Sequence, residues 1–374
     1  MTSAIEILSA DRLDRLPPAL SAAERAVRYT RALVRGGAAS YVDNAHVETK
    51  ALVVDGKVVP LVLVQPGADN SNVCSPYAHY VRYLAAERAM RHRRIPPALV
   101  TAAGLPAGLA LRFGGIDRVV YVNNWLLTSN PSPGLTSNQI GRITAMLTAA
   151  CPRSAIIFRS VNPRLDAAGV DALRCNEYRL IRSRRVYVLD PIEGRHRAHA
   201  NVRKDLGLLR RTPYEVVGNP ADLEPHVARM TMLYRDLYLR KYPALNPQFN
   251  ARFFALTLRD EVFSYRALRI DGRIDAFASY FVEGGVLTGV VIGYDRQLRR
   301  SLGLYRMTVA LLIEEAAAGG LLVNLSAGAD RYKLLRGAQP VDEFDAVYTR
   351  HLPWPRRAAW AAVSIASNRH ALHR

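Results

Sequence analysis

Apolar and polar residues alternate along the chain in a way that predicts the same order of elements twice. In the first half, two runs rich in β-branched residues flank Asp55-Gly56, a dipeptide that favours a tight hairpin turn. In the second half, two similar runs flank Asp271-Gly272. In each half a further strand, a helix and a short apolar strand follow the hairpin. This matching order predicts an internal duplication of architecture, although the two halves differ residue by residue.

The bounds of the elements follow from the apolar runs and the turn residues between them. Residues 1–40 are predicted to be helical, with Ser21 as N-cap, Glu24 completing a capping box, and an end at Gly36-Gly37. The other predicted elements of the first half are strands at 50–54, 58–64, 119–127 and 155–159 and helices at 76–91 and 137–150. Those of the second half are strands at 265–270, 274–282, 286–292 and 321–325 and a helix at 302–318.

This pattern predicts an α/β (α+β) protein of two tandem domains, each a mixed, mainly antiparallel sheet flanked by helices. We place the first domain at 1–177, a basic connecting segment at 178–215 and the second domain at 216–374. The alternative is one large mixed domain in which the two hairpins are unrelated.

Composition places the chain among folded globular proteins, with 374 residues, 49% of them hydrophobic and 22% charged. No apolar run approaches the roughly 20 residues that a membrane span needs, and residues 1–14 lack the pattern of a secretory signal. The three cysteines suit neither a disulfide framework nor metal-ligand spacing. We therefore expect a cytoplasmic protein with no membrane span and no metal site.

Net charge is the unusual property of this composition. Lys and Arg number 51 against 32 Asp and Glu, a formal charge of +19 that attracts polyanions. Many of these residues cluster where the two halves meet: Arg179, Arg182, Arg184, Arg185, Arg195, Arg197, Arg203, Lys204, Arg210 and Arg211. The clustering favours an anion-binding face, and the alternative is an arginine-rich, solvated surface.

A loop after the second meander carries a family resemblance. Arg300, Gly303 and Tyr305 resemble the loop of the GNAT (N-acetyltransferase) superfamily, which reads Gln or Arg, two residues, Gly, one residue, then Gly or Ala. In that family the helix after the loop binds the pyrophosphate of acyl-CoA through its free N–H groups. The resemblance implies donor-binding roles for Arg300 and Gly303. Tyr305 departs from the pattern, because a bulky side chain there would obstruct the approach of a pyrophosphate.

A narrower resemblance covers the C-terminal half. The segments that carry it are 246–249, Phe253-Phe254, Gly303-Leu304 and 327–337 (AGADRYKLLRG). They are similar to the tandem-GNAT group that holds the cellulose-synthesis-associated acetyltransferase-like proteins and the Fem aminoacyltransferases. The resemblance implies a transferase whose donor is acyl-CoA or aminoacyl-tRNA.

Within that resemblance, Lys333 corresponds to the Lys of the group's Tyr-Lys pair. We expect Lys333 to hold a donor phosphate or to stabilise charge on the reacting carbonyl, with a solvent-facing lysine as the alternative. Asp330 is a candidate base, although an Asp before a turn often serves local hydrogen bonding. The candidate donor contacts are Tyr332, Arg336, Arg203 and Lys204; the last two form part of the basic cluster.

The first half places polar residues beside its predicted strands. Asn123 and Asn124 interrupt an apolar run, Arg159 ends another, and a polar loop precedes the helix predicted at 76–91. Polar residues at strand ends often mark a pocket, so we assign acceptor binding to Asn70, Ser71, Tyr77, Asn123, Asn124 and Arg159. Turns and caps are the alternative interpretation. The segments 70–77 and 122–127 also show a faint resemblance to the seryl-tRNA-dependent transferase of valanimycin biosynthesis.

Three functions remain open from the sequence. The first is transfer of an aminoacyl group from aminoacyl-tRNA to an amine, hydroxyl or hydroxylamine of a small molecule or cell-wall precursor, with tRNA as partner and no permanently bound cofactor. The second is an acyl-CoA-dependent N-acyltransferase. The third is a non-catalytic nucleic-acid-binding protein, against which stands the lack of a helix-turn-helix, zinc-finger or RNA-recognition pattern.

Overall fold

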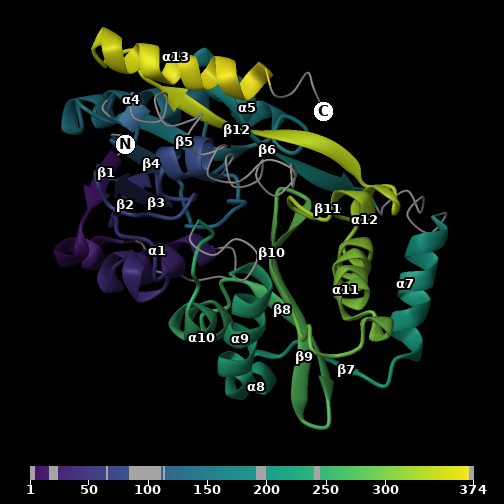
Figure 1. The fold of residues 1–374 in the computed structure, drawn as a ribbon. Helices are drawn as coiled ribbons and strands as arrows, with labels where there is room; N and C mark the ends of the chain where they lie inside the picture. The colour runs from purple at the N-terminus through teal and green to yellow at the C-terminus, as the bar shows by residue number, and fades with distance from the viewer. Residues whose placement is uncertain are drawn as a thin grey trace.

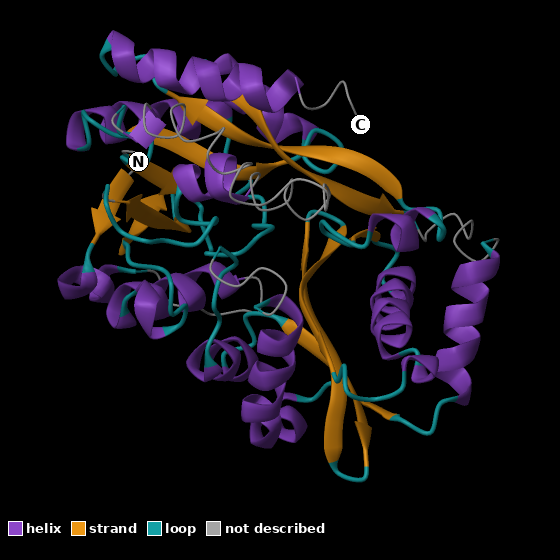
Figure 2. Cartoon of the chain, viewed as in Figure 1, coloured by secondary structure: helices purple, strands orange, loops and turns teal. Residues whose placement is uncertain are grey.

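Twelve strands form one continuous sheet in the computed structural model, which describes residues 5–16, 24–64, 66–83, 111–112, 114–190, 199–239 and 245–369. Helices cover both faces of this sheet (Figures 1 and 2). The strand order is β1-β2-β3-β4-β5-β12-β6-β11-β10-β9-β8-β7. Within the described residues, no helix is long and apolar enough to cross a bilayer.

The first half of the chain contributes six of these strands. They are β1 (Ile5–Leu8), β2 (Glu48–Val54), β3 (Lys57–Val64), β4 (Val119–Val122), β5 (Ala155–Val161) and β6 (Arg179–Leu189). Its helical segments are η1 (Ala10–Arg15), α1 (Arg25–Gly36), η3 (Ala38–Ser40), the π-helical η4 (Ala78–Tyr83), α4 (Ser137–Ala150) and α5 (Ala167–Cys175).

The second half contributes the other six strands. They are β7 (Glu215–Val217), β8 (Ser264–Ile270), β9 (Arg273–Glu283), β10 (Val286–Tyr294), β11 (Leu322–Asn324) and β12 (Gln339–Tyr348). Its helical segments are α7 (Ala200–Arg211), α8 (Pro220–Leu223), η5 (Glu224–His226), α9 (Val227–Tyr238), α10 (Ala251–Arg259), η6 (Arg300–Leu302), α11 (Leu304–Ala318), α12 (Asp330–Leu334) and α13 (Trp354–Arg369).

Both halves follow one plan, and they exchange their last strands. Each half is an antiparallel meander followed by a helix and one parallel pair, β4 with β5 and β10 with β11. The final strand of the second half, β12, pairs with both β5 and β6, while β6 pairs with both β11 and β12. The predicted mixed, mainly antiparallel fold is therefore confirmed, and each half is completed by a strand from the other.

The hairpin turns form for the expected reason. Asp55 and Gly56 have φ values of 48° and 80°, and Asp271 and Gly272 have values of 48° and 70°. Two successive residues with positive φ match the right-handed twist of the strands on either side, which explains the Asp-Gly pairs. The register of β2 with β3 and of β8 with β9 follows from these turns.

Several elements differ from their predictions. Residues 5–8 pair with β2 as a strand instead of forming a helix, because their alternating side chains complete the sheet edge. The strand predicted at 119–127 ends at Val122, since Asn123 adopts a φ of 58° and turns the chain. The predicted N-cap Ser21 and residues 84–91 of the helix predicted at 76–91 lie outside the described residues.

The segment 178–215, which we expected to connect two domains, contains β6 in the middle of the sheet and α7 on its surface. The domain boundaries themselves stay a prediction.

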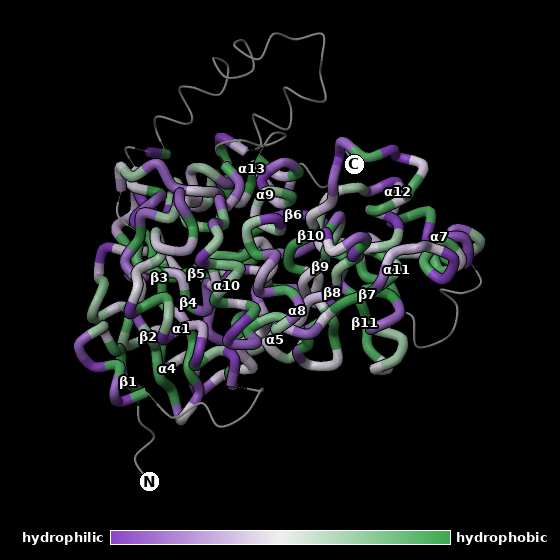
Figure 3. Tube along the Cα trace, turned by 90° about the horizontal axis from the view of Figure 1, so that it is seen from below, coloured by the Kyte–Doolittle hydropathy of each residue, from purple (hydrophilic) through white to green (hydrophobic). Residues whose placement is uncertain are grey.

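Side chains from both halves share one core. Tyr29 of α1 stacks on Trp125 at 5.0 Å between ring centroids and contacts Phe263 of the second half at 6.2 Å. The strands carry the hydrophobic stretches, as the green segments of β2 and β3 in Figure 3 show. Burial of aromatic side chains across the junction joins the halves into one packed body.

Because of the strand exchange, we predict that residues 1–190 do not fold alone. Without β12, β5 and β6 lose the strand between them, and their inner backbone groups lose their partners. Circular dichroism of this fragment should show no cooperative thermal transition, and mixing it with residues 191–374 should restore one. A cooperative transition in the isolated fragment would contradict the exchange.

Candidate functional site

The start of α11 is an uncapped helix end. Its N-cap is Gly303, which has a φ of 68° and no side chain to occupy the first N–H groups of the helix. Free N–H groups together with the helix dipole favour a bound anion at such an end. A Cβ at Gly303 would also lie 2.6 Å from the end of the Leu208 side chain, so a larger residue here would force that side chain to move.

α4, the equivalent helix of the first half, has a capping box at its start. The Thr136 hydroxyl accepts from the N–H of Gln139 at 3.3 Å, and the Gln139 carbonyl oxygen accepts from the N–H of Thr136 at 3.0 Å. Gln139 and Arg142 both donate to the carboxylate of Asp55 in the β2–β3 turn. The start of α4 therefore lies beside a carboxylate and is poorly suited to an anion.

The two parallel strand pairs differ in the length over which their strands are paired, and again the second half is the more open. β4 pairs with β5 along its whole length, from Val119 to Val122. β10 pairs with β11 only from Val286 to Thr288 and then continues to Tyr294. The end of β10 therefore has one edge without a strand partner among the described residues, and this edge leads toward the start of α11. An extended substrate chain can lie along such an edge.

Four half-buried tyrosines from four elements surround this end of β10: Tyr238, Tyr294, Tyr305 and Tyr332. The ring of Tyr305 lies 5.9 Å from that of Tyr294 and 4.8 Å from that of Tyr332. The hydroxyl of Tyr238 lies beside the backbone of Ile292, and burial raises its pKa to about 12. Burial also raises the pKa of Tyr305 and of Tyr332. These phenols stay protonated at neutral pH.

Exposed arginines gather at the same helix start. α7 runs alongside α11 (Figure 1) and brings its C-terminal turn, with Arg210 and Arg211, past Gly303. Arg299 and Arg300 lie in the loop that enters α11. All four are exposed, and none pairs with a carboxylate within the described part of the chain. The predicted anion-binding residue Arg300 thus lies beside the uncapped helix.

A buried carboxylate that the sequence did not reveal holds this region together. Asp205 of α7 accepts from Arg306 and Arg336 Nε, each at 2.6 Å, and from the Tyr332 hydroxyl at 2.9 Å. Arg336 also lies over the Tyr332 ring, 3.3 Å from its centroid. The predicted donor contacts Tyr332 and Arg336 therefore join α7, α11 and α12, and their polar atoms already have partners.

Lys333 is buried, contrary to the alternative of a solvent-facing lysine. Its ammonium donates to the carbonyls of Leu325, Ser326 and Ala327 at 2.7, 2.9 and 2.9 Å, and so fixes the loop after β11. Burial lowers the pKa of Lys333 to about 7; Asp330 opposes this shift and Arg184 adds to it. A role in shaping the loop is what the geometry shows, and contact with a donor stays a prediction.

The other predicted donor-side residues are exposed. Asp330 begins α12 after Ala329, a residue with a φ of 52°. Arg203 and Lys204 are exposed in the first half of α7, away from the C-terminal turn that reaches Gly303. The assigned roles of these three residues stay predictions.

The predicted acceptor residues mostly brace loops of the first half. The amides of Asn70, Asn123 and Asn124 bond to backbone groups or to Trp125. The N–H of Tyr77 donates to Asp117, and Ser71 is fully buried. These contacts agree with the alternative interpretation as turns and caps, and acceptor binding stays a prediction.

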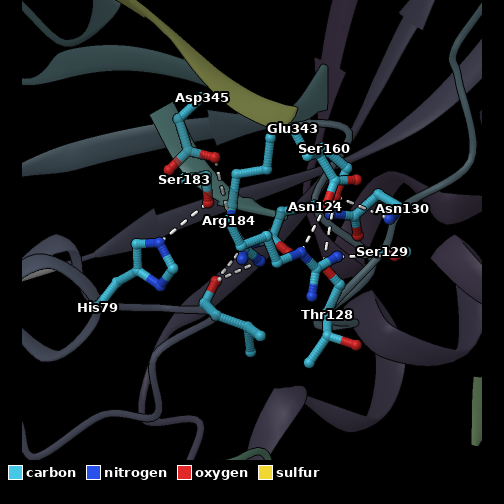
Figure 4. Close-up of polar contacts among 12 residues, drawn as sticks. His79, Asn124, Thr128, Ser129, Asn130, Ser160, Ser183, Arg184, Glu343 and Asp345 are labelled. Carbon is cyan, nitrogen blue, oxygen red and sulfur yellow. Dashed lines mark hydrogen bonds and ion pairs between the residues drawn. The ribbon is translucent and has the colours of Figure 1, made fainter. Parts of the chain in front are cut away.

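Arg159 belongs to a different environment, a buried polar cluster where the halves meet; Figure 4 shows its neighbour Asp345 in this cluster. Arg159 donates to the carbonyls of Val73 and Leu127 and lies 4.0 Å from the carboxylate of Asp345 on β12. The Tyr80 hydroxyl donates to the other oxygen of Asp345 at 2.8 Å. Burial raises the pKa of Asp345, and Arg159 opposes the shift.

The same cluster extends along β6 to the loop that Lys333 fixes. Arg184 bonds to Glu343 at 2.5 Å and to Ser129 at 2.7 Å, and Ser129 lies 3.4 Å from Ser326. His79 contacts Ser183 at 2.9 Å, and burial lowers the pKa of His79 to about 3, so the ring is neutral. Neutral imidazole and buried carboxyl groups can transfer protons. Within the described residues, no group of three His, Cys, Asp or Glu side chains could hold a metal.

Residues 195–334 match the family described as Acetyltransferase (GNAT) domain. These residues resemble a GNAT domain. The match includes α7, β10, the uncapped start of α11 and the Lys333 loop, so the helix start with free N–H groups lies within the matched residues. No curated protein sequence matches the chain.

Solved structures resemble the chain at low sequence identity. The C-terminal domain of the "Putative Lysylphosphatidylglycerol Synthetase" from Agrobacterium fabrum is 12% identical, with a TM-score of 0.50 over 92% of this chain and 97% of that one. L-PGS from Bacillus licheniformis is 13% identical, with a TM-score of 0.43 over 60% and 77%. FemX is 7% identical, with a TM-score of 0.42 over 57% and 77%. The predicted resemblance to tandem GNAT proteins is confirmed at the level of the fold.

We predict that Asp205→Asn destabilises the protein by about 3 kcal/mol, because it leaves a buried arginine without its counter-charge. Urea unfolding would measure the change, with Asp222→Asn on the exposed face of α8 as the control. A loss no larger than that of the control would show that Asp205 does not hold α7 to α11 and α12.

For Lys333 we predict a pH-dependent contribution to stability. Its pKa is lower in the folded protein than the ordinary 10.5, so unfolding takes up a proton between pH 7 and 10.5 and raising the pH favours the folded state. The free energy of unfolding of the wild type should therefore rise relative to that of Lys333→Met above about pH 7. A constant difference would mean that the three carbonyls keep the ammonium charged.

Proposed function

We propose that the chain transfers an aminoacyl group from aminoacyl-tRNA to an amine, hydroxyl or hydroxylamine acceptor. The observation that carries the proposal is the uncapped start of α11, surrounded by four exposed arginines that pair with no carboxylate among the described residues. A polyanionic donor matches such a surface better than a donor with a few phosphates, because each neutralised phosphate adds to the affinity. The net charge of +19 acts in the same direction over the whole molecule.

The side chain of Tyr305 favours aminoacyl-tRNA over acyl-CoA as the donor. Its ring packs between those of Tyr294 and Tyr332, where the GNAT loop pattern has a small residue. A pyrophosphate must approach the backbone closely to use the first N–H groups of the helix. The Tyr305 side chain obstructs that approach, so acyl-CoA is the less suitable donor, whereas a ribose and base can stack on the tyrosines.

The chemistry of the transfer needs little from the protein beyond placement and one proton. The acceptor nitrogen or oxygen attacks the ester carbonyl and gives up one proton, the bond between the carbonyl carbon and the ribose oxygen breaks, and the ribose oxygen takes up one proton. Tyr238 is suited to supply it: its hydroxyl lies at the open edge of β10, stays protonated, and donates to no group among the described residues. The similar domain from Agrobacterium fabrum carries the name "Putative Lysylphosphatidylglycerol Synthetase", and its shared fold is compatible with such a transfer.

The proposal predicts selective binding of aminoacyl-tRNA that depends on the arginines at α11. Purified protein would be titrated with aminoacyl-tRNAs and, separately, with acyl-CoAs, and donor deacylation would be followed. The double variant Arg210→Gln/Arg211→Gln should weaken tRNA binding about tenfold and lower its salt dependence. Arg252→Gln, an exposed arginine on α10, is the matched control and should change little.

Tyr305→Ala supplies the second arm of the same experiment. If Tyr305 excludes the pyrophosphate, the variant should gain affinity for CoA while the wild type shows little. Tight CoA binding by the wild type, together with indifference to tRNA, would overturn the proposal and favour an acyl-CoA-dependent N-acyltransferase. Binding of tRNA without any deacylation across acceptor classes would instead favour a non-catalytic nucleic-acid-binding protein.

A further inference from the structure

The outward face of α13 is apolar, which is unusual for a helix at the surface of a globular protein. α13 lies outermost over the central strands (Figure 1), and its inner face is buried through Trp360, Val363 and Ser364. On its outer face, Trp354 is 72% exposed and Ile365 is 55% exposed. Surface helices ordinarily place polar residues on this side.

These exposed residues form a continuous stripe. Ala358 and Ala362 are also exposed and lie between Trp354 and Ile365, at spacings of four, four and three residues. Side chains at these spacings share one face of a helix. We call these four residues the α13 stripe. One helix face offers far less than the roughly 800 Å² per partner of a stable protein interface, so a second copy of the chain is a poor occupant.

Arginines accumulate at the Trp354 end of the α13 stripe. Arg357 is exposed, and Arg356 lies close to Arg118 and Arg153. Burial lowers the pKa of Arg356, and repulsion from these two arginines lowers it further. Within the described residues, none of the four forms an ion pair with a carboxylate. Uncompensated positive charge beside an exposed tryptophan attracts a surface that is both anionic and apolar.

We propose that the α13 stripe and its four arginines dock the protein on an anionic lipid bilayer. Trp354 and Ile365 would enter the boundary between headgroups and acyl chains, and the arginines would contact lipid phosphates. A nucleic acid would satisfy the arginines and leave Ile365 and the alanines without a partner. The docking lies on a different surface from the start of α11 and does not depend on the donor.

Flotation with lipid vesicles tests this docking. The wild type should bind vesicles that contain phosphatidylglycerol, bind pure phosphatidylcholine vesicles weakly, and lose binding as salt rises. Trp354→Ser/Ile365→Ser should weaken binding to the anionic vesicles about tenfold or more. The matched control is Val216→Ser/Met232→Ser, which removes two side chains, each 44% exposed, from other faces and should bind as the wild type does.

A charge variant and a folding check complete the test. Arg357→Gln should weaken binding to anionic vesicles about fivefold, with Arg252→Gln as control, and thermal unfolding should show that every variant is folded. Failure of the wild type to bind anionic vesicles would overturn the proposal, as would equal binding by Trp354→Ser/Ile365→Ser. A wild-type dimer that this double variant dissociates, without vesicle binding, would assign the stripe to a second copy of the chain instead.

Discussion

The pairing of β6 with β12 at the middle of the sheet is the constraint on which the rest of the structure depends. Each strand ends one half of the chain and lies inside the sheet of the other half. The pairing leaves no free edge where the halves meet, since β5 and β11 both gain a partner there. It also places Arg184 opposite Glu343 in register, so the charges on these two strands are buried as a pair. The polar cluster of Figure 4 therefore results from the exchange of strands and belongs to neither half alone.

Although the two halves share one sheet, they differ at the start of the helix after the meander and at the edge of the adjoining strand. The helix after the meander is capped by Thr136 in the first half and begins at a bare Gly303 in the second. The adjoining strand is fully paired in the first half and extends beyond its partner in the second. A duplicated fold offers two equivalent helix starts, and among the described residues only the start of α11 keeps free N–H groups and an open strand edge. Asp205 fixes this region by holding α7 and its arginines against α11.

Local patterns made much of the fold predictable, and long-range pairing explains what was missed. The Asp-Gly hairpins and the helix at 137–150 were identified correctly, because turn residues and caps act within a few positions of the chain. β6 and β12 were not identified from the sequence, because charged residues interrupt their apolar runs. Such a run indicates an exposed strand or a loop. In the structure the two strands lie side by side and each supplies the opposite charges that allow the other to be buried. The burial of Asp205 was hidden for the same reason, because Arg306, Tyr332 and Arg336 lie on elements distant in sequence. The burial of Lys333 depends on a local fold instead: the loop after β11 turns its carbonyls toward the ammonium, and no residue pattern in that loop indicates such a turn. Gly303 and Arg300 were found because a short, contiguous loop carries the resemblance.

We propose above that the donor binds in the second half, at the start of α11. The most direct measurement is a crystal structure of the protein with a hydrolysis-resistant aminoacyl-RNA fragment that carries the terminal nucleotides of tRNA. We expect the phosphates of the fragment to lie against Arg210, Arg211, Arg299 and Arg300 beside the start of α11. A terminal base should stack on Tyr305, and the aminoacyl group should lie along the free edge of β10. A phosphate bound at the start of α4, or a fragment bound away from both helices, would contradict the proposal.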